Sequence, residues 1–274
     1  MTARQLVHKR RVATALAGLL LGVLGATTIA SPARAIHRGY DAPFGSYRFM
    51  VSLRLADTPD SHRCGGTLIK PDIVLTAAHC VARVPPGGLV AVVGTDVPAW
   101  PNAPQVSTLG HRVPETFDFR VDNRHDIAVV RLAAPQTTPG IRLAASEPRV
   151  GSGVVTAGWG CTNAPPVCRV RAANLQASAQ TVLPDAACGR EAFWTRPTYN
   201  ARTNICTRGT RARSTINRGD SGGPLLVRDR RGGFRQVGVT ALGADSAVKL
   251  YAGFTSIPVE RKWIEAAIRS LRTG

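Results

Sequence analysis

Cysteine placement constrains the fold of this 274-residue chain more than any other feature. The chain has six cysteines, Cys64, Cys80, Cys161, Cys168, Cys188 and Cys206, and all of them follow a stretch that has the pattern of an export signal. An even number of cysteines in an exported chain predicts three disulfides rather than reactive thiols. No two of them are spaced as CxxC, so we do not expect a zinc site.

Residues 1–35 have the composition of a signal peptide. Four cations lie among the first eleven residues, an apolar run extends from Val12 to Ala30, and Ala33-Arg34-Ala35 forms a small-residue cleavage site. We therefore expect removal of residues 1–35 and secretion of the remainder. A membrane anchor is the alternative, but three glycines interrupt the apolar run. The Arg10-Arg11 pair leaves twin-arginine export open as the route.

The chain is strongly basic, with a formal net charge of +18 from 35 Lys and Arg against 17 Asp and Glu. Removing residues 1–35 takes away five cations and no acids, which leaves +13. With 44% hydrophobic and 19% charged residues, the chain is too apolar to be disordered. Charge alone suggests a nucleic-acid-binding module, but interleaved aromatics and a recognisable motif are missing from the sequence. We therefore expect no nucleic-acid partner.

Short apolar runs separated by Gly, Pro, Asn and Asp predict an all-β fold. The expected strands are Phe49–Leu55, Asp72–Thr76, Leu89–Val93, Ile127–Leu132, Val154–Ala157, Pro224–Val227 and Val237–Ala241. One helix is expected, at the C-terminus, where apolar residues recur at intervals of three and four. These residues are Val259, Trp263, Ile264, Ala267, Ile268 and Leu271, and we expect their shared face to be core.

His79 has the context of a catalytic histidine. It ends an apolar strand within Leu75-Thr76-Ala77-Ala78-His79-Cys80, where small residues let other backbone pack close and Cys80 can anchor the loop. Asp126 is the candidate carboxylate partner, because it stands at the entrance to an apolar strand. We expect three other histidines, His37, His62 and His111, to be surface or hydrogen-bonded residues.

Ser221 is the candidate nucleophile, within Gly219-Asp220-Ser221-Gly222-Gly223-Pro224. Glycines beside a serine let a substrate carbonyl approach closely and let backbone N–H groups converge on a developing oxyanion. A serine hydroxyl needs a base to take its proton, and the base needs a carboxylate to hold its tautomer. His79 and Asp126 supply these two groups.

The segments around His79, Asp126 and Ser221, in this chain order, resemble those of the chymotrypsin/trypsin family of serine peptidases, in a secreted, bacterial-type form. Further matches are Cys64-Gly65-Gly66-Thr67-Leu68-Ile69, Gly158-Trp159-Gly160 and Trp263-Ile264, and the resemblance spans roughly residues 36–271. It implies that His79 is the general base, Asp126 its orienting carboxylate and Ser221 the nucleophile. The N–H groups of Gly219 and Ser221 would form the oxyanion hole.

The resemblance also implies the architecture, which is all-β, with two six-stranded antiparallel barrels, a C-terminal helix and an active site between the barrels. We expect one peptidase domain over residues 36–274, with the first barrel over about 36–140 and the second barrel and helix over about 141–274. The implied disulfides are Cys64–Cys80, Cys188–Cys206 and a local Cys161–Cys168 bridge.

Activation follows from the same resemblance. In the family, a new N-terminal ammonium inserts beside the aspartate that precedes the nucleophile, so Ile36 would pair with Asp220. Signal cleavage after Ala35 would create this N-terminus directly, whereas a cut after Ala30 would leave residues 31–35 as a short propeptide. His37 and Arg38 depart from the small apolar residue and glycine that usually follow the isoleucine.

The same resemblance implies a specificity pocket around Thr215, six residues before the nucleophile, with Ala241-Leu242-Gly243 as its wall. Trypsin-like members have aspartate at the first position, and a threonine cannot neutralise a buried Lys or Arg side chain. We therefore expect an uncharged residue before the cut bond, although Asp245 could reach the pocket mouth.

The expected function is a secreted serine endopeptidase that hydrolyses peptide bonds through a Ser-His-Asp triad and an acyl-enzyme. It would act as a monomer on protein or peptide substrates, without a cofactor or metal. The stretch 92–104 has Asp96 as its one carboxylate, too few for a calcium loop. The alternative is a catalytically silent protease-fold protein that binds anionic polymers, against which the intact triad argues.

Overall fold

The computed structural model describes residues 36–97, 103–118, 124–164, 168–189, 199–211, 214–243 and 251–273. The expected signal peptide and Asp245 lie outside these residues. Within the described ranges, no helix is long and apolar enough to cross a membrane.

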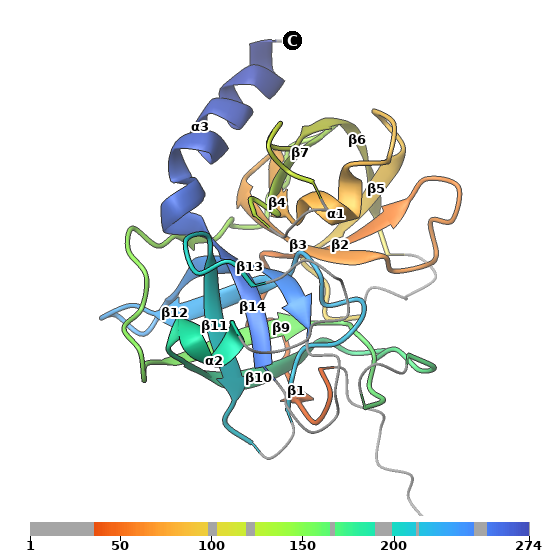
Figure 1. Ribbon diagram of the computed structural model, residues 1–274. Helices are drawn as coiled ribbons and strands as arrows, with labels where there is room; N and C mark the ends of the chain where they lie inside the picture. Colours follow the sequence, from red (N-terminus) through yellow and green to blue (C-terminus); the bar gives the residue numbers. More distant parts are fainter. Residues whose placement is uncertain are drawn as a thin grey trace, which may run out of the picture. The chain divides into compact units, whose positions relative to one another are not determined.

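Six strands from the first half of the chain form a closed antiparallel barrel (Figure 1). They are β2 (Met50–Leu55), β3 (Cys64–Lys70), β4 (Ile73–Thr76), β5 (Leu89–Val93), β6 (Gln105–Arg112) and β7 (Ala128–Leu132). Their order is β2-β3-β4-β7-β6-β5, and β5 pairs back with β2. Leu53, Leu68, Leu75 and Val129 are buried in its core, as expected for strands rich in branched apolar residues.

A second ring of six strands follows. It consists of β9 (Gly153–Gly158), β10 (Gln176–Val182), β11 (Asn204–Gly209), β12 (Pro224–Arg228), β13 (Phe234–Gly243) and β14 (Tyr251–Ser256). The order β10-β11-β14-β13-β12-β9 closes because β9 also pairs with β10. The expected pair of six-stranded antiparallel barrels is confirmed.

Two short strands attach to the edges of the second barrel. β8 (Arg142–Leu143) pairs in parallel with β13, an exception to the antiparallel pattern. β1 (Tyr40–Asp41) lies in the range expected for the first barrel but pairs with β10 of the second. The physical reason is that the N-terminal segment continues along the second barrel, where an antiparallel bridge joins His37 to Thr215.

Two helices are single turns, α1 (Ala78–Val81) and α2 (Asp185–Cys188), and the third, α3 (Ile257–Thr273), ends the described chain (Figure 1). The expected C-terminal helix is therefore confirmed, and it packs against β6, β7 and β13. Its buried apolar residues are Ile257, Ile264, Ala267, Ile268 and Leu271. The expectation for Val259 was wrong: it is 47% exposed, and the neighbouring Glu260 is buried instead because His125 provides a polar partner there.

Direct hydrogen bonds join the two barrels near their shared edge. Gly65 N of β3 donates to Ser221 O at 2.8 Å, and Thr67 Oγ1 donates to Gln236 Oε1 at 2.6 Å. Thr255 Oγ1 of β14 donates to Asp126 O at 2.9 Å. The loops that carry the candidate catalytic residues are therefore tied to each other across the junction.

Candidate active site

His79 and Asp126 form a buried pair. His79 stands in α1, which begins directly after β4 and Ala77, and Asp126 stands two residues before β7. The His79 Nδ1 atom lies 2.6 Å from Asp126 Oδ2, and the backbone N–H of His79 donates to Asp126 Oδ1 at 2.9 Å. Since β4 and β7 pair along their length, the two residues are placed together by the barrel itself. With Nδ1–H donating to the carboxylate, Nε2 is left as the proton acceptor.

Burial and charge act in opposite directions on His79. Burial alone would lower its pKa, and the positive charge of Arg63 also lowers it. The charge and hydrogen bond of Asp126 outweigh both, so the pKa of His79 is raised above its ordinary value. The Asp126 side chain is fully buried while 20% of the His79 side chain is exposed, an arrangement that suits a base open to solvent and substrate.

Ser221 lies within a tight turn that has glycines on both sides of it. Gly219 and Gly222 have φ values of +98° and +79°, a region that L side chains rarely adopt. A methyl group at Gly222 would lie 2.2 Å from Thr76 Oγ1, so the turn fits against the end of β4 only without side chains. Gly65 explains the Cys64-Gly65-Gly66 string, since a methyl group there would lie 3.1 Å from the backbone of Gly223.

Two N–H groups of this turn have no protein acceptor. Among the described residues, the backbone N–H groups of Gly219 and Ser221 donate no hydrogen bond, whereas those of Asp220, Gly222 and Gly223 all do. Unpaired N–H groups beside a serine form a site for an oxyanion.

A groove of about 530 Å³ brings the candidate residues together. His79, Ser221 and Gly219 all line it, and so do the cysteines Cys64 and Cys80. The expected pocket residues Thr215, Ala241, Leu242 and Gly243 do not line this groove.

Sequence reasoning missed the role of His62, which we expected to be merely surface-exposed or hydrogen-bonded. It is buried, and its ring joins Ser52 Oγ at 2.7 Å to the carbonyl oxygen of Gly219 at 2.8 Å. Because a carbonyl only accepts, Nε2 carries the proton and Nδ1 accepts from the Ser52 hydroxyl. Burial lowers the pKa of His62 to about 4, which keeps the ring neutral. His62 therefore fixes the peptide group that follows Gly219, next to the unpaired N–H groups.

Asp220 is fully buried directly before Ser221. Its Oδ1 accepts from Gly160 N at 2.8 Å and its Oδ2 from Asn217 N at 2.7 Å. Burial raises the pKa of Asp220 to about 7, an effect that these N–H groups and the charge of Arg171 offset only in part. The carboxyl group thus lies in an environment where one further cation would stabilise its ionised form.

Ile36, the predicted partner of Asp220, is also fully buried. In the uncut chain its nitrogen belongs to a peptide bond and carries no charge, so the ion pair concerns a cleaved form and stays a prediction. A glycine at position 160 is required beside Asp220, because a methyl group there would lie 2.4 Å from Asp220 Cγ.

The expected specificity residues belong to two segments of the second half of the chain, around Thr215 and at the end of β13. Thr215 is fully buried and its hydroxyl has no partner among the described residues. Ala241, Leu242 and Gly243 end β13, which is tied to the serine turn by the Gly222 N–H donating to Thr240 O at 2.9 Å. These positions stay predictions as a specificity pocket.

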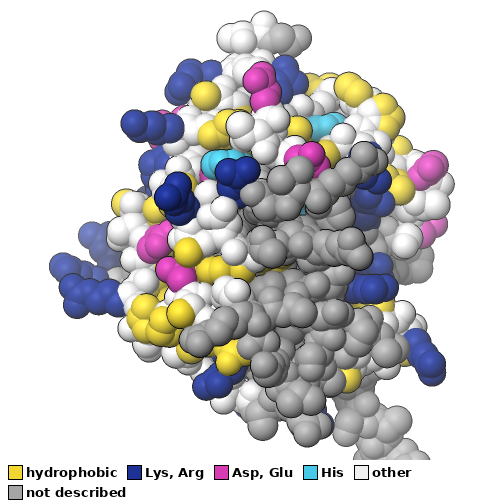
Figure 2. Space-filling model, in the orientation of Figure 1, with side chains coloured by type: hydrophobic (Ala, Val, Ile, Leu, Met, Phe, Trp, Pro, Cys, Tyr) yellow, Lys and Arg dark blue, Asp and Glu magenta, His cyan; other side chains and the backbone are white. Residues whose placement is uncertain are grey.

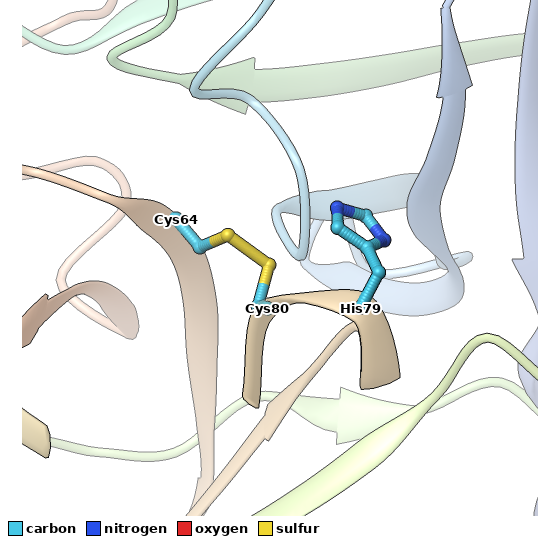
Figure 3. Close-up of side chains that lie close together, drawn as sticks. All are labelled: Cys64, His79 and Cys80. Atoms are coloured by element: carbon cyan, nitrogen blue, oxygen red, sulfur yellow. A yellow bond between two sulfur atoms is a disulfide. The ribbon is translucent and has the colours of Figure 1, made fainter. Parts of the chain in front are cut away.

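Disulfides join Cys64 to Cys80, Cys161 to Cys168 and Cys188 to Cys206, the pairs that the resemblance implied. Figure 3 shows His79 and Cys80 projecting from the same turn, with the disulfide reaching across to Cys64. The ligand atoms of Cys64, His79 and Cys80 lie within 4.8 Å of one another. Both sulfurs are bonded to each other, however, and a disulfide offers no thiolate to a metal. The bridge instead anchors the turn that carries His79.

Basic side chains are dispersed over the protein surface. Figure 2 shows dark blue Lys and Arg side chains at several separate places on the visible face. This distribution does not by itself define a binding surface, so a role for charge has to be argued from particular residues.

Comparison with known proteins adds an independent line of support. The family model described as Trypsin matches residues 36–264. Trypsin iota of Drosophila melanogaster is 29% identical over 265 residues, covering 95% of this chain and 98% of that protein. Chymotrypsin-C of Bos taurus is 30% identical over 247 residues, covering 84% of this chain and 88% of that protein. These relatives are insect and mammalian proteins, and they do not bear on the expected bacterial type.

A solved structure shares the fold. Neuropsin, a serine protease expressed in the limbic system of mouse brain, matches with a TM-score of 0.71 at 21% identity. The match covers 85% of this chain and all of that chain.

Proposed function

The chain belongs to the trypsin family and is a serine endopeptidase, and from that premise we propose that it is secreted and cleaves proteins through His79, Asp126 and Ser221. The observation that carries this proposal is the buried His79–Asp126 pair opening into the same groove as Ser221. We further propose that it acts as a monomer without a membrane anchor.

The proposed reaction has two stages. His79 Nε2 takes the proton of Ser221 Oγ, which attacks the carbonyl carbon of the substrate, and Asp126 stabilises the imidazolium that forms. The N–H groups of Gly219 and Ser221 hold the oxyanion, and His79 then gives its proton to the departing amine. Water enters with His79 again as base, and hydrolysis of the ester frees Ser221.

The test is proteolysis by the secreted protein, with Ser221→Ala as the control. We expect the parent to release fragments from a labelled denatured protein and to bind an organophosphonate covalently at Ser221. The Ser221→Ala variant should do neither. A parent that stays unlabelled and inactive would support the alternative of a catalytically silent protein that binds anionic polymers.

We also propose that cleavage before Ile36 activates the enzyme by pairing the new ammonium group with Asp220. The raised pKa of Asp220 supports this, since a buried carboxyl gains most from a new cation. N-terminal sequencing of active secreted protein tests the route. A start at Ile36 agrees with direct activation by signal cleavage, and a start at Ser31 contradicts it.

Specificity before the cut bond is proposed to favour uncharged side chains, because Thr215 places no carboxylate at the expected pocket. Cleavage of a mixed peptide library measures this directly. A strong preference for Arg or Lys before the cut bond would contradict the assignment.

A further inference from the structure

The catalytic groove carries three arginines that the reaction itself does not use. We propose that Arg63, Arg171 and Arg218 bind acidic side chains of the substrate segment that follows the cut bond. This inference rests on the proposed function and specifies its substrates as chains with Asp or Glu after that bond.

Arg63 stands beside the catalytic histidine. Its Nε atom donates to the carbonyl oxygen of Cys80 at 3.1 Å, which holds the guanidinium at the disulfide, and its terminal nitrogens donate to no described residue. The side chain is exposed and lines the groove. The positive charge of Arg63 opposes protonation of His79, so the two groups are close enough to interact electrostatically.

Arg171 lies against the oxyanion turn. Its Nη1 atom donates to the carbonyl oxygen of His62, and a methyl group at Gly219 would lie 2.9 Å from that nitrogen. Burial lowers the pKa of Arg171, which indicates that part of its guanidinium is already desolvated. A carboxylate in the groove would meet a cation that is fixed in place, and fixed partners lose less side-chain entropy on binding.

Arg218 comes directly before Gly219. Its backbone is held on both sides, by Arg218 N donating to Asn217 Oδ1 at 2.8 Å and by Arg218 O accepting from Cys161 N at 2.8 Å. The side chain is exposed at the groove. The backbone is therefore rigid where the side chain enters the site.

The described residues that line the groove carry no negative charge. Among the described residues that line it there is no Asp or Glu, and none of the three arginines forms an ion pair with a described carboxylate. Like charges gathered in a partly enclosed groove focus the electrostatic potential there. A substrate carboxylate is the group that would relieve this repulsion.

The position of the groove identifies the substrate segment. The residue before the cut bond is expected at Thr215 and β13, and none of these residues lines the groove. The groove is lined instead by the serine turn, by His79 and by both cysteines of the Cys64–Cys80 disulfide. The chain that leaves as the amine, after the cut bond, is therefore the segment placed against the arginines.

Acyl transfer to an added amine measures how well the groove accepts the segment that follows the cut bond. An ester substrate acylates Ser221 and releases its alcohol with a proton. A dipeptide amide then attacks the acyl carbon through its free amine and passes a proton to His79. The peptide bond forms as the ester bond to Ser221 Oγ breaks, and His79 gives that proton to Ser221 Oγ. The matched acceptors are Asp-Ala-amide against Asn-Ala-amide, and Ala-Asp-amide against Ala-Asn-amide.

We expect the parent to favour the acidic acceptor of each pair. An exposed guanidinium–carboxylate pair corresponds to a factor of about two to five, and the ratio should shrink as salt is added. Arg63→Gln, Arg171→Gln and Arg218→Gln should each lower the ratio, and the triple variant should bring it to about one. Each ratio compares two acceptors used by the same variant, so a loss of overall activity in that variant does not change the ratio.

Arg231→Gln is the matched control, since this exposed arginine lies between β12 and β13 and does not line the groove. It should keep the ratio of the parent. Equal use of acidic and neutral acceptors by the parent, or a preference that survives in the triple variant, would overturn the inference. Failure to hydrolyse the ester at all would instead contradict the proposed function.

Discussion

His125 Nδ1 lies 2.6 Å from Glu260 Oε1, joining the residue before Asp126 to the first turn of α3. His125 has a φ of +56°, in the left-handed region that costs a residue with a side chain about 1 kcal/mol. Glu260 has only 5% of its side chain exposed, so its carboxyl group depends on this partner. The C-terminal helix thus helps to hold the turn that presents Asp126 to His79.

We expect Glu260→Ala to reduce kcat about tenfold with little change in KM, because a displaced Asp126 weakens the base without removing a substrate contact. The free energy of unfolding should also fall by about 1 to 3 kcal/mol, since His125 loses its partner. Steady-state kinetics and urea unfolding measure the two effects. Glu265→Ala, on an exposed face of the same helix, is the control and should keep the kcat of the parent. If Glu260→Ala also keeps that kcat, Glu260 contributes to stability but does not position Asp126.

His62 gives a prediction about the oxyanion site. His62→Phe removes the hydrogen bond to Gly219 O, so we expect kcat to fall about 10- to 100-fold through a misplaced N–H group while KM changes little. The variant should be compared with His111→Phe, whose ring belongs to β6 rather than to the groove. If both variants keep the kcat of the parent, the His62–Gly219 bond does not position the oxyanion site.

The pKa of His62 adds a stability prediction of its own. Its value of about 4 in the folded chain is below the ordinary 6.5, so the neutral ring stabilises the fold above pH 6.5 and that contribution is lost as the pH falls through 4. The loss should amount to about 3 kcal/mol between these limits. Urea unfolding from pH 7 to pH 4 should show a smaller decline for His62→Phe than for the parent, and parallel declines would contradict the assignment.

Local sequence patterns predicted the strands that are rich in apolar residues and missed strands that contain glycine or polar residues. All seven expected strands overlap observed ones, as β2, β4, β5, β7, β9, β12 and β13. Two of the missed strands, β3 and β10, contain Gly65-Gly66 and a Gln/Ser/Thr-rich run, compositions that are unfavourable for a strand alone. Barrel closure buries these residues anyway, because each lies between two partners.

Chemically specific strings were more informative about the site than periodicity was. His79, Asp126 and Ser221 could be selected because each stands in a motif with a stated use. His62 and Glu260 could not, since their roles depend on contacts at sequence separations of 157 and 135 residues. Arg63, Arg171 and Arg218 were hidden among 31 arginines, and the fold alone gathers them.

Asp126→Asn should reduce kcat about 10⁴-fold. An amide at this position favours the tautomer of His79 with the proton on Nε2, which leaves no lone pair facing Ser221. In the parent, the raised pKa of His79 predicts that activity rises with pH and reaches half its maximum above pH 6.5. A pH profile of kcat/KM measures this, and a midpoint below 6.5 would contradict the proposed effect of Asp126.

Asp220 predicts that stability depends more strongly on pH before activation than after it. In the uncut chain its pKa is about 7 against an ordinary 3.8, so its contribution to stability is full below pH 3.8 and is lost as the pH rises through 7. The loss should be on the order of 4 kcal/mol. The uncut chain can be studied with Ser221→Ala, which prevents it from cutting itself. From pH 4 to pH 8 in urea unfolding, it should lose more stability than the same chain that also carries Asp220→Asn, and this difference is the decline due to Asp220.

Adding Asp220→Asn to that chain should remove most of this decline, because an amide does not titrate. In a chain that begins at Ile36, the ammonium group would favour the carboxylate and lower the pKa of Asp220, so the decline should also shrink there. Equal declines in the uncut chain, the Asp220→Asn variant and the chain starting at Ile36 would show that Asp220 does not couple cleavage to the folding of the site. A decline that is present in the uncut chain but absent from both the Asp220→Asn variant and the chain starting at Ile36 would show that activation acts through the Asp220 carboxyl group.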